Sequence, residues 1–182
     1  MVLGVAYPFG LRDVKVWPIT NVVTETLGTM QDLPASRTFA FTEAEAFEEL
    51  RGDDKLILSR GTGAQVNWDL EAGGLHIDVY KTLFGGVVTD SGVTPNQIKK
   101  IRKKSTESRP YFKIEGQAIS DTGGDVHGVV FRCRATGDVE GSFADATFYL
   151  TKGTGTGFPS QAAASIDALY DLIYNETEAA IV

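Results

Sequence analysis

The stretch 110–152, PYFKIEGQAISDTGGDVHGVVFRCRATGDVEGSFADATFYLTK, decides the fold class. Apolar and polar residues alternate with the period of a half-buried strand in three segments: 111–119, 126–135 and 143–151. The segments between them are rich in Gly, Asp and Ser, which favour chain reversals. The pattern predicts an antiparallel β-meander whose apolar face packs against a second layer.

Length and composition agree with a single β-rich domain over residues 1–182. A chain of 182 residues buries roughly 70% of its unfolded surface on folding. Hydrophobic content of 42% and charged content of 23% are ordinary, whereas 20 glycines, clustered at reversals, are typical of turn-rich β proteins. A net charge of -7 argues against tight binding of nucleic acid, whose phosphates attract basic surfaces.

Cysteine and histidine are too scarce for a disulfide framework or a structural zinc site. The chain has one cysteine, Cys133, and two histidines, His76 and His127. Alternation places Cys133 on the apolar face of its strand with Val129 and Phe131, which predicts a small core residue, not a nucleophile beside His127. Both histidines are expected to be structural, so we predict no catalytic, metal or cofactor site.

Two further motifs are better explained by turns. The glycines of 153–157 resemble a phosphate loop, but no Lys-Ser/Thr follows them, and a flexible turn is predicted. Asp53 and Asp54 are adjacent and point apart, which fits a turn better than a pair of catalytic carboxylates. The first ten residues lack a basic region and no window reaches ~20 apolar residues, so neither a signal peptide nor a membrane span is predicted, and the chain is expected to be cytosolic when made.

The N-terminal part has one predicted strand and one ambiguous segment. Residues 1–38 are expected to hold a short strand that ends at Pro18, followed by a loop. Within 38–60, Thr42 and Glu45 have the spacing of a capping box, so local propensity favours a short helix over 42–51. The wider alternation, with a turn at 52–54, favours a long hairpin over 39–60 instead.

Helical spacing appears in two later segments. Residues 69–86 carry Ala72, Leu75, Val79 and Leu83 at helical intervals with Gly85 at the end, which predicts one helix packed over the sheet. The C-terminal tail, 153–182, has a similar apolar stripe after 165 and is predicted to hold a second helix. Residues 92–110 are predicted to be a polar connection.

Several segments, in order and spacing, resemble one family. They are YPFGLRDVKV at 7–16, ELRGDDKLIL at 49–58, VNWDLEAGGLHIDVYKTLFGG at 66–86, TPNQ at 94–97, PYFKIEGQAISDTGGDVHGVVFRCRATG at 110–137 and TFYLT at 147–151. Together they are similar to the major tail protein, or tail tube protein, of long-tailed bacteriophages, particularly those of actinobacterial hosts.

The resemblance implies a mainly β fold: a β-sandwich or barrel of antiparallel strands with one flanking α-helix. It also implies that subunits form six-fold rings, which stack into a tube around a tape-measure protein and meet tail terminator and tail-tip proteins. The phage genome would pass through this tube without specific binding, in the virion tail, after assembly in the host cytoplasm. An acidic channel wall suits that role, because carboxylates repel phosphates.

Two charged segments are candidate contact surfaces. The acidic hairpin is expected to carry subunit contacts and part of the channel wall; its candidate residues are Glu43, Glu45, Glu49, Arg51, Gly52, Asp53 and Asp54. The basic run KKIRKK is expected to face away from the channel, between rings or on the outer surface, or to be a solvated loop; its candidate residues are Lys99, Lys100, Arg102, Lys103 and Lys104.

Functions of other classes have less support from the sequence. A host-surface-binding tail module is the alternative, and it requires a concave site with clustered aromatic side chains. An enzyme requires a charge relay or paired carboxylates at suitable positions, and none is evident.

Overall fold

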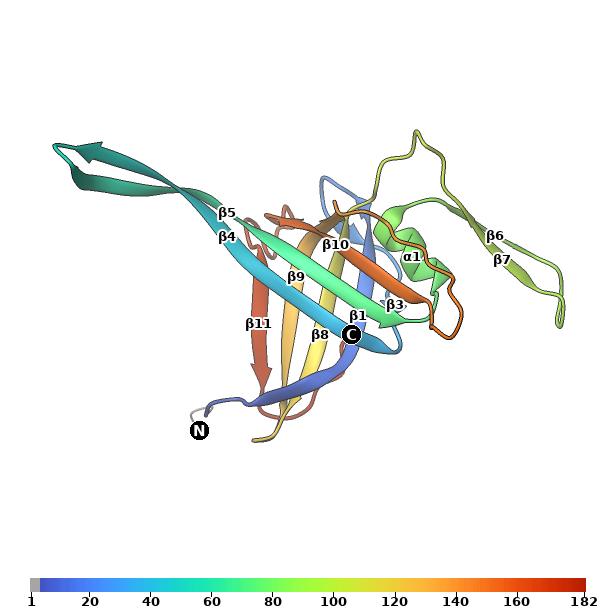
Figure 1. Cartoon of the computed structure of the whole chain (residues 1–182). Helices are drawn as coiled ribbons and strands as arrows, with labels where there is room; N and C mark the ends of the chain where they lie inside the picture. Colours follow the sequence, from blue (N-terminus) through green and yellow to red (C-terminus); the bar gives the residue numbers. More distant parts are fainter. Residues whose placement is uncertain (1–3) are drawn as a thin grey trace.

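The computed structural model describes residues 4–182 and consists mainly of antiparallel β-strands (Figure 1). Within these residues there is one helix, α1 (Ile77–Phe84). The strands are β1 (Pro8–Asn21), β2 (Thr26–Leu27), β3 (Gln31–Asp32), β4 (Ser36–Gly52), β5 (Lys55–Gly73), β6 (Val87–Ser91), β7 (Ile98–Arg102), β8 (Phe112–Ser120), β9 (Asp125–Ala135), β10 (Leu150–Phe158) and β11 (Tyr170–Asn175). The expected fold class, a mainly β sandwich with a flanking helix, is confirmed.

The main sheet folds over on itself. Its strand order is β2-β1-β8-β9-β10-β5-β4, with β3 on β1 and β11 on β9. The pair β4–β5 crosses in front of β1, β8 and β9 (Figure 1). Strand β10 joins the two layers, because its residues pair with β5 from Leu150 to Gly157 and with β9 from Gly155 to Phe158. Strands β6 and β7 form a separate hairpin.

The core lies between the two layers. Strand β5 contributes Val66, Trp68 and Leu70 at every second position, and each is at most 2% exposed. Opposite them lies Phe112 of β8, whose ring meets the Trp68 ring edge-on with centroids 5.4 Å apart. Further buried side chains come from β1, β8, β9 and one face of α1; they include Val14, Val16, Val79, Leu83, Ile114, Val130 and Cys133. Cys133 is therefore a core residue, as predicted.

The glycines of β10 form a strand, so the prediction of a flexible turn there is wrong. A Cβ on Gly155 would lie 2.6 Å from Cζ2 of Trp68 and 2.1 Å from the carbonyl oxygen of Arg134. A Cβ on Gly157 would lie 2.8 Å from Val130. Only a strand without side chains on this face fits against Trp68 and β9, which explains the alternation of glycine in GTGTG.

The predicted meander is right for two strands and wrong for the third. Strands β8 and β9 pair as expected, but 143–149 is irregular, and Phe143 and Phe148 are 88% and 95% exposed. The place beside β9 is taken by β10. A bulge in the pairing of β8 with β9 also turns Val130 toward Cys133, whereas simple alternation had placed Val129 there.

Three other predictions need correction. Residues 69–73 are the end of β5, hydrogen-bonded to both β4 and β10, and these ladders override their helical spacing; only the second half of the predicted helix forms, and it stops at Gly85 as expected. The C-terminal tail forms β11 on the open edge of β9 instead of a helix. The predicted polar connection at 92–110 contains β7, which pairs with β6.

The N-terminal strand is longer than predicted, and the long hairpin forms as predicted. Strand β1 continues through Pro18 to Asn21 instead of ending at the proline, and the carbonyl oxygen of Pro18 accepts a hydrogen bond from Gly28. The long hairpin is confirmed over the helical alternative for 42–51, and it extends from Ser36 to Gly73.

Candidate functional site

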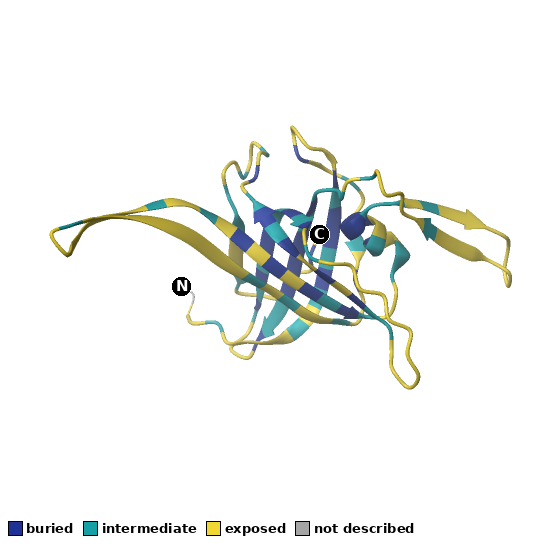
Figure 2. Cartoon of the chain, turned by 45° about the horizontal axis from the view of Figure 1, so that its top comes forward, coloured by how far each residue is buried: buried dark blue, intermediate teal, exposed yellow. Residues whose placement is uncertain are grey.

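The outer half of the β4–β5 hairpin, residues 43–65, is a long arm that leaves the body of the molecule (Figure 1). Strand β10 pairs with β5 only as far as Val66, so among residues 4–182 the outer parts of β4 and β5 pair with each other alone. The arm is exposed on both faces, whereas the inner half alternates between buried and exposed residues (Figure 2).

The arm exposes large apolar side chains to solvent. Each of them is more than half exposed; they are Phe47, Leu50, Leu56, Ile57 and Leu58. Leu50 and Leu58 lie directly opposite each other across the two strands, so they form one apolar pair on one face. A two-stranded hairpin is marginally stable in water without a packing partner, and exposed strand edges invite pairing with another chain.

The face opposite the Leu50–Leu58 pair carries an acidic stripe, which also includes Phe47. The face of β4 that holds Phe39 and Phe41 over the core continues outward with Glu43, Glu45 and Glu49, because side chains alternate along the strand. The hydroxyl of Tyr170 donates to a carboxylate oxygen of Glu43 at 2.9 Å, at the point where the arm leaves the body. The acidic candidates therefore lie together on one side.

The remaining candidates of the arm lie at or near its tip. Arg51 contacts the carboxylate of Glu49, with N···O 2.7 Å, on the exposed surface. Asp53 and Asp54 form the turn with φ of 49° and 60°, the left-handed region that two-residue hairpin turns require. A Cβ on Gly52 would lie 2.8 Å from Cδ1 of Ile57. The tip is thus a tight turn, as the sequence predicts.

The basic candidates lie on a second arm, β6–β7, at the opposite side of the body (Figure 1). Lys99 contacts Asp78 of α1, so one face of this arm is held against the helix. Lys103 donates to the carbonyl oxygen of Ser108 at 3.3 Å. Lys100 and Arg102 are exposed on β7, while Lys104 is exposed just beyond it. The acidic and basic candidate sets are not brought together within one chain.

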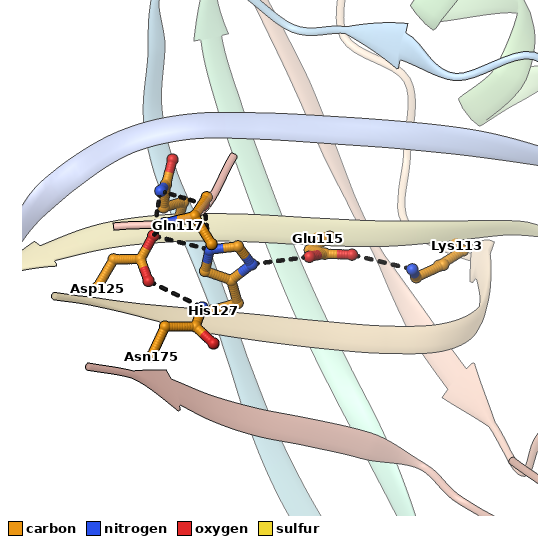
Figure 3. Close-up of polar contacts among 7 residues, drawn as sticks. Lys113, Glu115, Gln117, Asp125, His127 and Asn175 are labelled. Atoms are coloured by element: carbon orange, nitrogen blue, oxygen red, sulfur yellow. Dashed lines mark hydrogen bonds and ion pairs between the residues drawn. The ribbon is translucent and has the colours of Figure 1, made fainter. Parts of the chain in front are cut away.

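Sequence reasoning missed a buried polar cluster on the outer face of β8 and β9 (Figure 3). His127 is 5% exposed and lies between two carboxylates: Nδ1 is 2.9 Å from Glu115 and Nε2 is 3.1 Å from Asp125. The Glu115 carboxylate also contacts Lys113 at 2.9 Å. Both ring nitrogens of His127 face acceptor oxygens, an arrangement that suits the doubly protonated imidazolium.

The cluster holds the end of the chain against the sheet. The backbone N–H of Ala179 donates to Asp125 at 3.0 Å, and Gln117 donates to the carbonyl oxygen of Ala179 at 2.9 Å. Asn175 donates to the other oxygen of Asp125 at 2.9 Å. The signal in the sequence is the run of polar residues at every second position in 113–117, followed by 125–127. A polar face of a half-buried strand normally contacts solvent, so this pattern alone does not predict a buried cluster.

The contacts shift two pKa values in opposite directions. Burial opposes ionisation of Asp125, but hydrogen bonds from Ala179, Gln117, Asn175 and His127 outweigh it and lower the pKa from 3.8 to about 2. Burial also opposes charging of His127, but hydrogen bonds with the two carboxylates outweigh it and raise its pKa above the ordinary 6.5. The cluster acts as an ionic latch for the C-terminal tail.

Comparisons with known proteins add no relative. No protein-family model matches the chain, and no match is found among curated proteins. In the part of the chain that the structure describes, no helix has the length and apolar character needed to cross a membrane.

Proposed function

We propose that this chain is a structural virion protein that self-assembles into stacked six-fold rings, which form the tail tube of a long-tailed bacteriophage. The observation that carries this proposal is the β4–β5 arm, a long hairpin that projects from the body with apolar side chains exposed. Within residues 4–182 no third strand pairs with this arm, and a second copy of the chain would supply one.

The energetics of the arm support self-association. Five large apolar side chains, each more than half exposed, remain in contact with water in the single chain. Burying a fully exposed side chain of this size contributes about 1.5–3 kcal/mol. Because these side chains are 54–63% exposed, each contributes roughly half of that, and together they offset part of the cost of association. The open edges of β4 and β5 add backbone donors and acceptors for pairing with a neighbour.

The charge of the chain supports a conduit rather than a nucleic-acid-binding protein. With a net charge of -7, a ring of six copies repels the phosphates of a passing genome and does not retain it. The proposed partners are other copies of the chain, the tape-measure protein, the tail terminator and the tail-tip proteins. We propose that the acidic arm contributes subunit contacts and part of the channel wall.

A structural role also fits the one cluster of buried titratable groups described above. His127, Glu115 and Asp125 are buried and hydrogen-bond to one another and to the tail. These hydrogen bonds hold the tail against the sheet, and a role in stabilising the fold accounts for them.

The alternative is a host-surface-binding tail module, and one feature favours it. The loop between β9 and β10 exposes Phe143 and Phe148, and the Phe143 and Tyr149 rings have centroids 5.2 Å apart. Exposed aromatic side chains on a loop are typical of binding surfaces.

Electron microscopy of the purified full chain over a range of concentrations tests the proposal. Rings or tubes with six-fold rotational symmetry are expected, with sedimentation velocity showing loss of monomer as concentration rises. Protein that stays monomeric at all concentrations contradicts the proposal. If that monomer binds intact host cells, and substitution of Phe143 and Phe148 by Ser abolishes binding, the host-surface module is the better account.

A further inference from the structure

The outward face of the β6–β7 arm is cationic. Pairing of β6 with β7 places Lys100 opposite Thr89 and Arg102 opposite Val87, so these four side chains share one face. Together with Lys104 they line a groove. Within residues 4–182, Lys100, Arg102 and Lys104 make no ion pair with a carboxylate.

The neighbouring cation of the run points the other way. Lys99 lies opposite Asp90 on the second face of the arm and contacts Asp78 of α1. This contact fixes which face of the arm is directed toward the body. The cationic groove therefore faces away from α1 and is open to another molecule.

The acidic arm is complementary to this groove in charge, and both surfaces include an exposed apolar residue. Residues 43–65 hold six carboxylates and three cationic side chains, a net charge of -3, whereas residues 87–104 hold one carboxylate and five cationic side chains, a net of +4. Each surface also includes an exposed apolar residue, Phe47 on the stripe and Val87 in the groove, at 60% and 53% exposure. A polar rim around an apolar contact is typical of protein interfaces.

We propose that the groove of Val87, Thr89, Lys100, Arg102 and Lys104 binds the acidic stripe of Glu43, Glu45, Phe47 and Glu49 from a second copy of the chain. The inference rests on the proposed self-assembly and names the surfaces that meet. The two arms lie on opposite sides of the body, so one chain does not fill its own groove (Figure 1). Contact between different surfaces of two copies is head-to-tail, and such contacts generate closed rings or continuing stacks.

The contacts that the stripe makes within its own chain are compatible with binding to the groove of a second copy. Glu49 is paired with Arg51 on an exposed surface, and exposed pairs contribute little, so the groove competes with that pair at small cost. Glu45 is exposed and its carboxylate lies over Gly61, and no hydrogen bond or ion pair holds it within the described residues. Charge complementarity of this kind fixes orientation and speeds association.

Charge reversal with rescue tests the contact. Lys100→Glu with Arg102→Glu is expected to raise the concentration needed for association at least ~10-fold, a change of about 1.4 kcal/mol. The control is Lys103→Glu, which reverses a cation of the same run outside the groove. It is expected to change the concentration needed for association less than ~2-fold. Adding Glu45→Lys and Glu49→Lys to the groove variant is expected to restore association. Sedimentation velocity at low and high salt measures the association of each variant. Salt is expected to weaken the wild-type contact because exposed charges are screened.

Four outcomes overturn the inference. The first is that the groove variant associates as well as the wild type, and the second is that Lys103→Glu weakens association equally. The third is that the reciprocal charge reversal does not restore association. The fourth is that the wild type binds a short DNA duplex and the groove reversal abolishes this binding. The last outcome would make the groove a phosphate site instead. The experiment distinguishes failure of the six-fold tube from failure of the proposed contact. If the wild type forms only dimers or open chains, and the groove reversal abolishes this association while the reciprocal reversal restores it, the contact is supported and the six-fold tube is contradicted.

Discussion

The inner and outer halves of the β4–β5 hairpin belong to the same two strands but have opposite surroundings. The inner half packs Phe41 and Trp68 into the sandwich, and Trp68 is 2% exposed. The outer half places Glu45 and Leu58 in water, with Leu58 60% exposed. Backbone pairing continues from one half to the other, with register shifts at Ser36/Thr38, Glu45/Phe47 and Leu50/Arg51. The difference is that the inner half has its partners within the chain, whereas the outer half requires a neighbour.

Removal of a core side chain from the inner half has the largest expected effect. Trp68→Ala deletes the ring that contacts Phe112 and the glycines of β10, and it leaves a cavity between the layers. Such truncations lower the free energy of unfolding by about 3–5 kcal/mol. Chemical denaturation of the wild type and the variant measures the difference. A change below about 1 kcal/mol would contradict the assignment of Trp68 to the core.

Buried and exposed carboxylates provide a second contrast. Asp125→Ala removes one of the two carboxylates that contact His127 and also removes the anchor of Ala179, so a loss of about 3 kcal/mol is expected. Glu45→Ala, on the exposed arm, is expected to change the free energy of unfolding by less than about 0.5 kcal/mol. If denaturation experiments give equal losses for the two substitutions, the claim that the buried carboxylate stabilises the fold more than the exposed one is contradicted.

The latch also predicts the pH dependence of stability. Because folding raises the pKa of His127, its contribution is fully present below pH 6.5 and is lost as pH rises through the higher folded pKa. Because folding lowers the pKa of Asp125, its contribution is present above pH 3.8 and is lost as pH falls toward about 2. Unfolding midpoints measured from pH 3 to 9 should be highest between these limits. His127→Gln should remove the loss on the alkaline side, and an unchanged profile in that variant would contradict the assignment.

The turn at the tip tests whether the arm must be formed. Asp53→Val with Asp54→Val places β-branched residues at two positions with positive φ, which costs about 1–3 kcal/mol at each position. Since only the arm depends on this turn, we expect the body to keep its unfolding midpoint while assembly is suppressed. Asp53→Asn with Asp54→Gly, which suits the turn, is the matched control. Normal assembly of the valine variant would show that the arm is dispensable.

The apolar pair of the outer half, Leu50 and Leu58, is expected to contribute little to the stability of the single chain. Leu50→Ser with Leu58→Ser exposes no new cavity, because both side chains are already more than half exposed. The free energy of unfolding of the single chain should change by less than about 1 kcal/mol, while association weakens. A variant that assembles as well as the wild type would leave the exposed pair without a role.

Local patterns predicted the parts of the fold that local physics decides. Alternation predicted β8, β9 and the hairpin, and Asp53, Asp54 and Gly85 marked a turn and a helix end. The rest depends on contacts distant in sequence. Nothing within GTGTG shows that Trp68 lies against it, and the stripe at 166–173 does not show that β9 has an open edge for β11. The two charged surfaces were identified as candidates, but their placement on opposite arms required the fold.

The most direct test of the outer half as an assembly surface is the reactivity of a thiol placed on it. Cys133 is buried, so Ser59→Cys introduces a single exposed thiol on the arm. Its rate of alkylation should be that of a free thiol in dilute monomer and should fall at least ~10-fold under assembling conditions, as expected for burial at an interface. Asp121→Cys, on the exposed β8–β9 turn, reports the change at a position outside the arm. An alkylation rate at Ser59→Cys that does not change between monomer and assembly would contradict the account.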